Sequence, residues 1–235
     1  MGNIAVIIAR GGSKRIPKKN IKEFLGKPII TYSIEAALKS NLFDEVMVST
    51  DDMQIAEFAN KFGANVPFLR SSKNSNDFAT TVDVLIEVLN EYKKIGKEFE
   101  KCCCIYPTAP FVTPIKLKKA YEYLNIQNAY SVIPICEFSF SIYRSFGKNL
   151  DKIYYNYPEF EKSRSQDLPK SYHDCGQFYF FDVVKFLKKK SLVSNETIGL
   201  EVSQIEVQDI DNIDDWLIAE MKYNLLQKKI NDEEL

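Results

Sequence analysis

A strongly basic segment, Arg10 to Asn20, follows directly after the apolar run Ile4 to Ile8. It reads Arg-Gly-Gly-Ser-Lys-Arg-Ile-Pro-Lys-Lys-Asn and so combines two adjacent glycines with five Lys or Arg side chains. Glycines let a backbone turn tightly and present N–H groups to an anion, while the cations supply charge. The segment matches neither the Gly-x-Gly-x-x-Gly nor the Gly-x-x-x-x-Gly-Lys pattern. It predicts a phosphate-binding loop, and an ordinary basic surface loop is the alternative.

Two aspartates near the C-terminus, Asp209 and Asp211, have the spacing of a metal site. If the chain is extended here, residues two apart share a face, so both carboxylates point one way and Ile210 points toward the core. Two hard oxygen ligands that leave positions for water and phosphate suit Mg²⁺. The alternative is a helix N-terminus, where acids are favoured, but Asp214 and Asp215 fit that role better.

Zinc chemistry is not favoured by the sequence. His173 is the single histidine, and the five cysteines contain no Cys-x-x-Cys pair. Three of the cysteines, Cys102 to Cys104, are consecutive within an apolar stretch. We expect buried, reduced thiols that act as small hydrophobic groups.

The overall composition limits the class of partner. Lys and Arg (31) nearly balance Asp and Glu (32), so the net charge of -1 gives no general reason to expect binding to nucleic acid or membranes. An RNA-binding module would need a basic face interleaved with aromatic residues. There is no apolar run of membrane-spanning length and no signal-peptide pattern at the start, which predicts a cytoplasmic protein.

The surrounding pattern alternates short apolar runs with amphipathic stretches, which predicts an α/β fold with a mostly parallel sheet. A single domain over residues 1–235 is expected from the length. In open sheets of this kind, ligands bind beyond the carboxyl ends of the strands, where the basic loop lies. We expect strands at 4–8, 45–49, 66–69, 102–106, 129–135 and 176–181, and helices from Pro28, over 55–62, 82–89 and 115–124, and from Ile213.

Residues 138–175 interrupt this alternation. The stretch is rich in Tyr, Phe, Ser, Lys and Arg and has no sustained helical period. An irregular segment of this length inside a compact domain usually has a function or contacts a partner. We therefore expect an excursion from the domain here.

Five short motifs in order resemble the cytidylyltransferases that activate sialic-acid-type sugars, and the resemblance covers nearly the whole chain. The family implies a three-layer, Rossmann-like sheet of the nucleotide-diphospho-sugar transferase type, CTP as substrate and Mg²⁺ as cofactor. The motifs are Ala9 to Asn20, Thr50-Asp51-Asp52, Asp77-Phe78-Ala79-Thr80-Thr81, Tyr106-Pro107-Thr108-Ala109-Pro110 and Gln208-Asp209-Ile210-Asp211.

The resemblance also implies roles for residues on the nucleotide side. The triphosphate would be held by the basic loop, with Lys14 meeting the leaving pyrophosphate and with Arg10, Lys14 and Asp211 as the catalytic groups. The cytosine would be read by Arg70, by the hydroxyl of Thr81 and by the backbone near Ala79. Thr80 and Thr81 also suit the N-terminal cap of a helix, and both roles can coexist. The nucleotide-binding set is Ala9, Arg10, Gly11, Gly12, Ser13, Lys14, Asn20, Arg70, Ala79 and Thr81, and the metal ligands are Asp209 and Asp211.

The sugar end departs from the usual pattern. Enzymes acting on N-acetylneuraminate typically begin the fourth motif with Gln and follow it with Arg, whereas this chain has Tyr106 and Val112. The run Arg164 to Tyr179 instead resembles the members of the family that act on pseudaminic acid. By that resemblance Arg164 would pair with the sugar carboxylate, while Gln177 and Tyr179 would line the sugar site together with Tyr106. Phe178, Phe180 and Phe181 have the pattern of strand core.

In this family the excursion commonly packs against a second subunit, so a homodimer is expected and Arg164 would act in cis or in trans. The same reaction on N-acetylneuraminic, legionaminic or 3-deoxy-octulosonic acid stays an alternative. A non-catalytic nucleotide-binding protein that has kept the fold is another.

Overall fold

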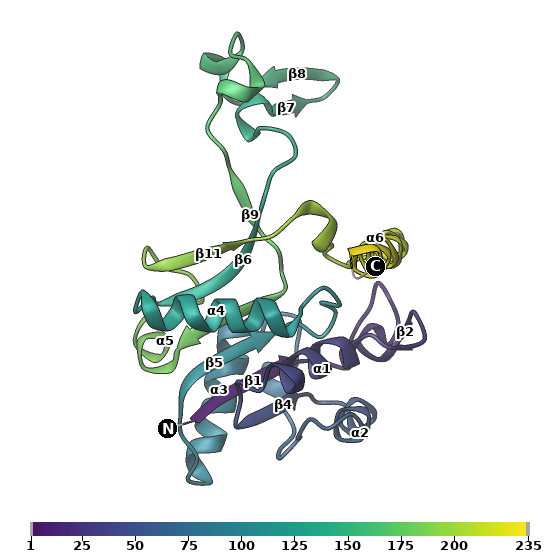
Figure 1. The fold of residues 1–235 in the computed structure, drawn as a ribbon, viewed down its shortest axis with the longest axis vertical. Helices are drawn as coiled ribbons and strands as arrows, with labels where there is room; N and C mark the ends of the chain where they lie inside the picture. Colours follow the sequence, from purple (N-terminus) through teal and green to yellow (C-terminus); the bar gives the residue numbers. More distant parts are fainter. Residues whose placement is uncertain (1, 234–235) are drawn as a thin grey trace.

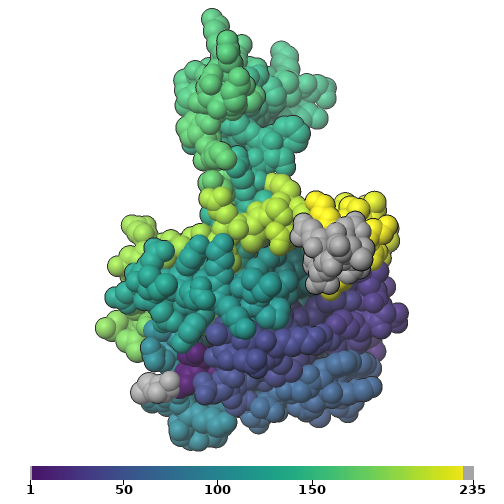
Figure 2. Space-filling view, in the orientation of Figure 1, coloured from purple at the N-terminus to yellow at the C-terminus, as the bar shows by residue number. Residues whose placement is uncertain are grey.

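The computed structural model describes residues 2–233 and shows a three-layer α/β body from which one arm projects (Figures 1 and 2). The helices are α1 (Ile30–Ser40), α2 (Met53–Lys61), α3 (Thr81–Lys94), α4 (Pro114–Ile126), α5 (Val183–Lys189) and α6 (Ile213–Glu233). The strands of the central sheet are β1 (Gly2–Ile8), β4 (Glu45–Ser49), β5 (Phe99–Ile105), β6 (Ser131–Glu137), β9 (Tyr172–Asp174), β10 (Phe178–Asp182) and β11 (Thr197–Glu201). Two small hairpins are formed by β2 (Glu23–Phe24) with β3 (Lys27–Pro28) and by β7 (Phe146–Asn149) with β8 (Lys152–Tyr155).

The central sheet has the order β11-β6-β10-β5-β1-β4, with β9 also paired to β6. Strand β1 runs parallel to both β4 and β5, and β6 runs parallel to β11. Strand β10 is antiparallel to its neighbours β5 and β6. The carboxyl ends of β1, β4 and β5 therefore lie at one edge of the sheet, and the segments that follow them lie side by side.

Both faces of the sheet are buried, which explains the continuous apolar runs of the sequence. Along β5, Cys103 and Ile105 face the layer formed by α1, α2 and α4, whereas Cys102 and Cys104 face α3 and α5. The aromatic residues of β10 alternate in the same way between the two faces. The five cysteines are buried free thiols, as expected from the sequence.

Helix α6 forms a third packing region with the β2–β3 hairpin and the segment after β5. The Phe24 ring makes edge contacts with Trp216 at 5.5 Å and with Tyr32 at 5.4 Å between ring centroids. Ile210, just before α6, is fully buried in the same cluster. This packing fixes the chain around Ile210 against the body, as the alternation of Asp209, Ile210 and Asp211 predicts.

One sequence expectation about elements was wrong. Residues 66–69 form no strand, and only an isolated bridge joins Asn65 to Met47. Pro67 lies in this stretch and lacks the N–H that a ladder needs. Residues 138–175, for which an irregular segment is expected, carry the β7–β8 hairpin and short 3-10 turns and end in β9, which pairs with β6. The alternation also did not predict α5 and β11.

The excursion leaves the body between β6 and β9 and projects well beyond the sheet (Figures 1 and 2). Within residues 2–233, no helix combines the length and the apolar character needed to cross a membrane.

Candidate active site

The basic loop begins where β1 ends and is fixed by contacts within the loop and with the segment after β4. The buried Asn20 side chain donates to the carbonyl oxygen of Arg10 at 2.8 Å and thereby ties the two ends of the loop together. The Gly11 N–H donates to the Asp51 carboxylate at 2.9 Å. Gly11 has no room for a side chain, since a Cβ there would lie 2.6 Å from Oδ2 of Asp52, whereas Gly12 faces open space.

A cavity of about 680 Å³ opens beside this loop, within the size range of ligand pockets. It brings together residues from four distant parts of the sequence, as the carboxyl-edge rule predicts. Of the residues predicted from the sequence, the lining includes Arg10, Ser13, Lys14, Asn20, Thr81, Tyr106, Asp209 and Asp211. The lining also includes Arg15, Lys19 and Asp77, for which the sequence reasoning gave no role or only a minor one.

The cations of the loop are paired with carboxylates across the cavity. Asp77 binds Arg10 through Oδ1 at 2.8 Å and Lys14 through Oδ2 at 2.6 Å. Asp211 binds Arg15 at 2.8 Å. Hydrogen bonds from Lys14 and then Arg10 lower the pKa of Asp77, so this carboxylate is ionised at neutral pH.

Asp209 and Asp211 line the cavity together, opposite the loop. The pKa of Asp209 is raised, first by desolvation and then by the negative charge of Asp211. Lys19, near the end of the loop, donates to the carbonyl oxygen of Ile210, between the two aspartates, at 2.6 Å. Burial lowers the pKa of Lys19, although both aspartates oppose that effect.

These two carboxylates fit a magnesium ion. Desolvation and, after it, the charge of Asp211 raise the pKa of Asp209, and a bound cation would offset the negative charge of both carboxylates. Among residues 2–233, no three His, Cys, Asp or Glu side chains form a complete metal site. Mg²⁺ is commonly held by one or two carboxylates together with water and phosphate oxygens, which is the donor set that Asp209, Asp211 and a polyphosphate would provide.

Several predicted nucleotide residues do not line the cavity. Ala9 is fully buried in the core. The Arg70 guanidinium is buried, and it donates to the Ser49 hydroxyl at 3.0 Å and to the Ser49 carbonyl oxygen. The Ala79 N–H donates to the Asn76 side chain at 3.0 Å. Neither glycine of the loop lines the cavity as the structure has it.

The predicted sugar residues are divided between the cavity and more distant places. Tyr106 lines the cavity, and its hydroxyl lies 3.3 Å from that of Thr81. Tyr179 packs edge-on against Tyr106 from behind, with 5.7 Å between ring centroids. Gln177 is buried and donates to the carbonyl oxygen of Glu206 at 2.6 Å.

Arg164 lies in the arm, at the start of a 3-10 turn over Ser165–Asp167, and does not line the cavity. Figure 1 shows the arm, with β7 and β8 at its far end, projecting from the body beyond β6 and β9. Arg164 therefore does not contact the cavity of its own chain in this structure.

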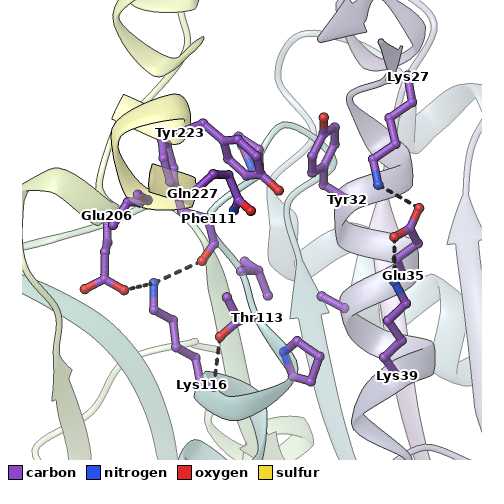
Figure 3. Close-up of a pocket in the computed structure, with 15 residues that line it drawn as sticks. Lys27, Tyr32, Glu35, Lys39, Phe111, Thr113, Lys116, Glu206, Tyr223 and Gln227 are labelled. Atoms are coloured by element: carbon purple, nitrogen blue, oxygen red, sulfur yellow. Dashed lines mark hydrogen bonds and ion pairs between the residues drawn. The ribbon is translucent and has the colours of Figure 1, made fainter. Parts of the chain in front are cut away.

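A second, smaller cavity of about 210 Å³ lies between α1, α4 and α6 (Figure 3). Its charged groups satisfy one another, because Glu35 binds both Lys27 and Lys39, and Lys116 binds Glu206. Pro110 of the fourth motif lines it, but none of the predicted catalytic, nucleotide-binding, sugar-binding or metal residues does. The cavity beside the basic loop gathers eight of the predicted site residues and is therefore the candidate active site.

The central sheet, with a cavity at the carboxyl ends of its parallel strands, has the nucleotide-diphospho-sugar transferase fold. Two solved structures support the fold alone. A CMP:2-keto-3-deoxy-manno-octonic acid synthetase complexed with CTP superimposes with a TM-score of 0.67 at 17% identity and covers 97% of this chain and 100% of the other. A 4-diphosphocytidyl-2C-methyl-D-erythritol synthase from Anaerococcus prevotii gives 0.62 at 15% identity, covering 95% of this chain and 98% of the other.

The family model described as Cytidylyltransferase matches residues 4–199, and the chain belongs to this family of nucleotidyltransferase enzymes. It is 41% identical to a pseudaminic acid cytidylyltransferase of Campylobacter jejuni over 99% of both chains. It is 32% identical to a CMP-N,N'-diacetyllegionaminic acid synthase of Legionella pneumophila, over 97% of this chain and 98% of the relative.

Proposed function

We propose that this protein transfers CMP from CTP to the anomeric hydroxyl of pseudaminic acid and releases pyrophosphate. The observation that carries the proposal is the 41% identity, over nearly the whole of both chains, to the Campylobacter jejuni protein of that printed activity. Identity falls to 32% for the relative named for legionaminic acid and to 31% for an N-acylneuraminate cytidylyltransferase of Oncorhynchus mykiss, of which the chain covers 49%. The order of these identities favours pseudaminic acid.

In the proposed reaction the anomeric oxygen of the sugar forms a bond to the α-phosphorus of CTP, and the proton of the anomeric hydroxyl is released to water. The bond between that phosphorus and the bridging oxygen of the β-phosphate breaks, and the electron pair leaves with pyrophosphate. Catalysis of such a transfer is mainly positioning and stabilisation of charge. A site rich in fixed cations, with a cavity large enough for a nucleotide, suits this reaction.

The basic loop would hold the triphosphate, with Arg10 and Lys14 on the leaving group and with Ser13, Asn20 and the Gly11–Gly12 backbone completing the contacts. On the base side, Thr81 lies on the cavity wall. Arg70, whose guanidinium is held on Ser49, and the backbone near Ala79 would read the cytosine together with Thr81.

Asp209 and Asp211 would hold Mg²⁺ against the phosphates. When bound, the ion supplies positive charge that offsets the charge gathering on the phosphate oxygens. Arg15 would exchange its carboxylate partner Asp211 for phosphate when the metal binds, and Lys19 would keep the Ile210 carbonyl in place.

We place the sugar next to Tyr106, with Tyr179 and Gln177 supporting that wall. Arg164 lies in the arm, so its proposed contact with the sugar carboxylate calls for a second subunit. Exposed apolar side chains on the arm support a homodimer, because patches of this kind mark protein contacts. They include Phe140 and Leu150, which are 88% and 87% exposed. Arg164 would then act in trans.

We place the reaction in the cytoplasm. The five buried cysteines are free thiols, which fits a reducing compartment.

The direct test is pyrophosphate release from CTP and Mg²⁺ with a panel of acidic sugars. Pseudaminic acid should support the fastest release, with legionaminic, N-acetylneuraminic and 3-deoxy-octulosonic acids slower by at least about tenfold, as expected when a site must match polar groups of its substrate. Faster release with another sugar would reassign the substrate. CTP binding without release on any of them would favour a non-catalytic nucleotide-binding protein.

An Asp211→Asn variant tests the metal site separately. It keeps the side-chain volume but removes a charged ligand, so the Mg²⁺ concentration that gives half-maximal rate should rise and the maximal rate should fall by about 100-fold or more. Asp214→Asn, at the start of α6, is the matched control and should change neither value. Full turnover of Asp211→Asn at low Mg²⁺ would remove the assignment.

A further inference from the structure

One carboxylate, that of Asp77, neutralises two cations of the basic loop. Its two oxygens lie 2.8 Å from Nη1 of Arg10 and 2.6 Å from Nζ of Lys14. The same Arg10 nitrogen also donates to the backbone oxygen of Asn76 at 3.2 Å. The segment that precedes α3 therefore covers the cationic groups of the loop.

The surroundings of Asp77 leave this side chain free to move. Asn76 is anchored, because its side chain donates to the Lys73 carbonyl and accepts from the N–H groups of Phe78 and Ala79. Thr80 caps α3 in a capping box with Asp83. Asp77 itself is half exposed, and its recorded side-chain partners within residues 2–233 are the two loop cations. Rotation of one side chain into water would release both.

A polyphosphate held by Arg10 and Lys14 needs the same N–H donors. Two phosphate oxygens on neighbouring donors would take the positions that Oδ1 and Oδ2 of Asp77 occupy. Two anions at such short range repel each other, so the carboxylate and the polyphosphate exclude one another. The carboxylate presents two oxygen acceptors bonded to one atom, as a phosphate group does, so both can accept from the same pair of cations.

We propose that Asp77 is a displaceable stand-in for the polyphosphate, which pairs with Arg10 and Lys14 when no nucleotide is bound, yields to the triphosphate of CTP, and returns as pyrophosphate leaves. The proposal rests on the proposed function, since it assumes that the loop holds the phosphates. Its consequence is that Asp77 weakens the binding of pyrophosphate and so helps the product to leave. Asp77 thus acts through Arg10 and Lys14 rather than on the reacting atoms.

The test is calorimetric titration of inorganic pyrophosphate into the full-length protein and into an Asp77→Asn variant. Asparagine keeps the volume of the side chain but not its charge. Exposed ion pairs contribute little each, so the Kd for pyrophosphate should fall by about twofold to tenfold. Asp51→Asn is the matched control, because it removes the same charge beside the loop but keeps the acceptor for the Gly11 N–H. Its Kd should change by less than about twofold.

A double-mutant cycle separates displacement from a general change in charge. In a Lys14→Met background, Asp77→Asn should give a smaller gain, because one of the two ion pairs is already gone. Equal gains in both backgrounds, or equal gains from Asp51→Asn, would overturn the proposal. So would weaker or unchanged pyrophosphate binding by Asp77→Asn, since Asp77 would then serve to position the cations.

The proposed function fails in a different way. If neither the unmodified protein nor any variant binds pyrophosphate at millimolar concentration, the loop holds no polyphosphate, and both the function and the stand-in role fall. If the protein binds pyrophosphate and Asp77→Asn does not improve binding, the function stands and only the stand-in role falls. Thermal unfolding of each variant checks that it is folded, and Asp77→Ala should shift the Kd in the same direction.

Discussion

The two glycines of the basic loop should respond in opposite ways to the same substitution. Neither has the positive backbone angle that excludes a side chain. A Cβ on Gly11 would lie 2.6 Å from Oδ2 and 2.9 Å from Cβ of Asp52, and a Cβ on Gly12 would meet nothing within 4 Å. Asp52 cannot yield cheaply, because it caps α2 by accepting hydrogen bonds from the N–H groups of Gln54 and Ile55.

The magnitude follows from these contacts. Replacing glycine by alanine at a compatible site stabilises a protein by about 0.4–1 kcal/mol, because the unfolded chain loses freedom. That gain applies to both positions and cancels in their comparison. Gly11→Ala loses the cap of α2, which is worth about 1 kcal/mol, and adds about 1–3 kcal/mol of overpacking. Gly11→Ala should therefore be about 2–4 kcal/mol less stable than Gly12→Ala.

Thermal and urea unfolding of the two variants measure this difference. For a chain of this size each 1 kcal/mol shifts the Tm by about 2–4 °C, so the two Tm values should differ by about 5 °C or more. Gly12→Ala should be at least as stable as the unmodified protein. If Gly11→Ala unfolds at the same temperature as Gly12→Ala, the loop does not press against the cap of α2 and the reasoning is wrong.

Two further predictions concern a partly buried ion pair and the cavity wall. The Asp182 carboxylate binds Lys101 at 2.9 Å and caps α5. Burial acts to raise the pKa of Asp182, but the hydrogen bonds outweigh it and the pKa is lowered. The stability that Asp182 contributes is therefore present above the unfolded pKa of about 3.9 and is lost as the pH falls through the folded pKa. Asp182→Asn should lower the free energy of unfolding in urea by about 1–2 kcal/mol at pH 7. This difference between the variant and the unmodified protein should shrink below about pH 4, and a difference that stays constant with pH would contradict the role given to Asp182. Tyr106→Phe keeps the ring against Tyr179 but removes the hydroxyl near Thr81, so the KM for the sugar should rise by about threefold to 30-fold with the stability nearly unchanged. A rise confined to the KM for CTP would move Tyr106 to the nucleotide side.

The strands of the body could be predicted from the sequence because both of their faces are buried. A run such as Cys102 to Ile105 is apolar at every position, and this is the pattern of a central strand between two helical layers. The loop after β1 was predicted because its composition is unusual at that place. The burial of Ile210 could be predicted from the alternation of side chains along an extended chain, which also puts Asp209 and Asp211 together on the opposite face, toward the cavity.

Other features lie beyond single-sequence reasoning, because they depend on contacts between distant segments. Nothing in the stretch around Asp77 indicates that it pairs with Arg10 and Lys14, more than 60 residues away. The β7–β8 hairpin is mostly exposed and so lacks the alternation that marks a half-buried strand. Lys19 was one of several cations in the loop, and only the fold distinguishes it by its bond to Ile210.

The two halves of the candidate site come from opposite ends of the chain, and the packing of α6 is what joins them. Trp216 and Ile210 are buried against Phe24 of the β2–β3 hairpin, directly after the basic loop. The Lys19–Ile210 hydrogen bond and the Arg15–Asp211 ion pair then cross between the loop and the aspartates. Since a metal and a polyphosphate would have to be held together, the aromatic cluster does more than stabilise the fold. It fixes the separation between the cations and the carboxylates on which the proposed transfer depends.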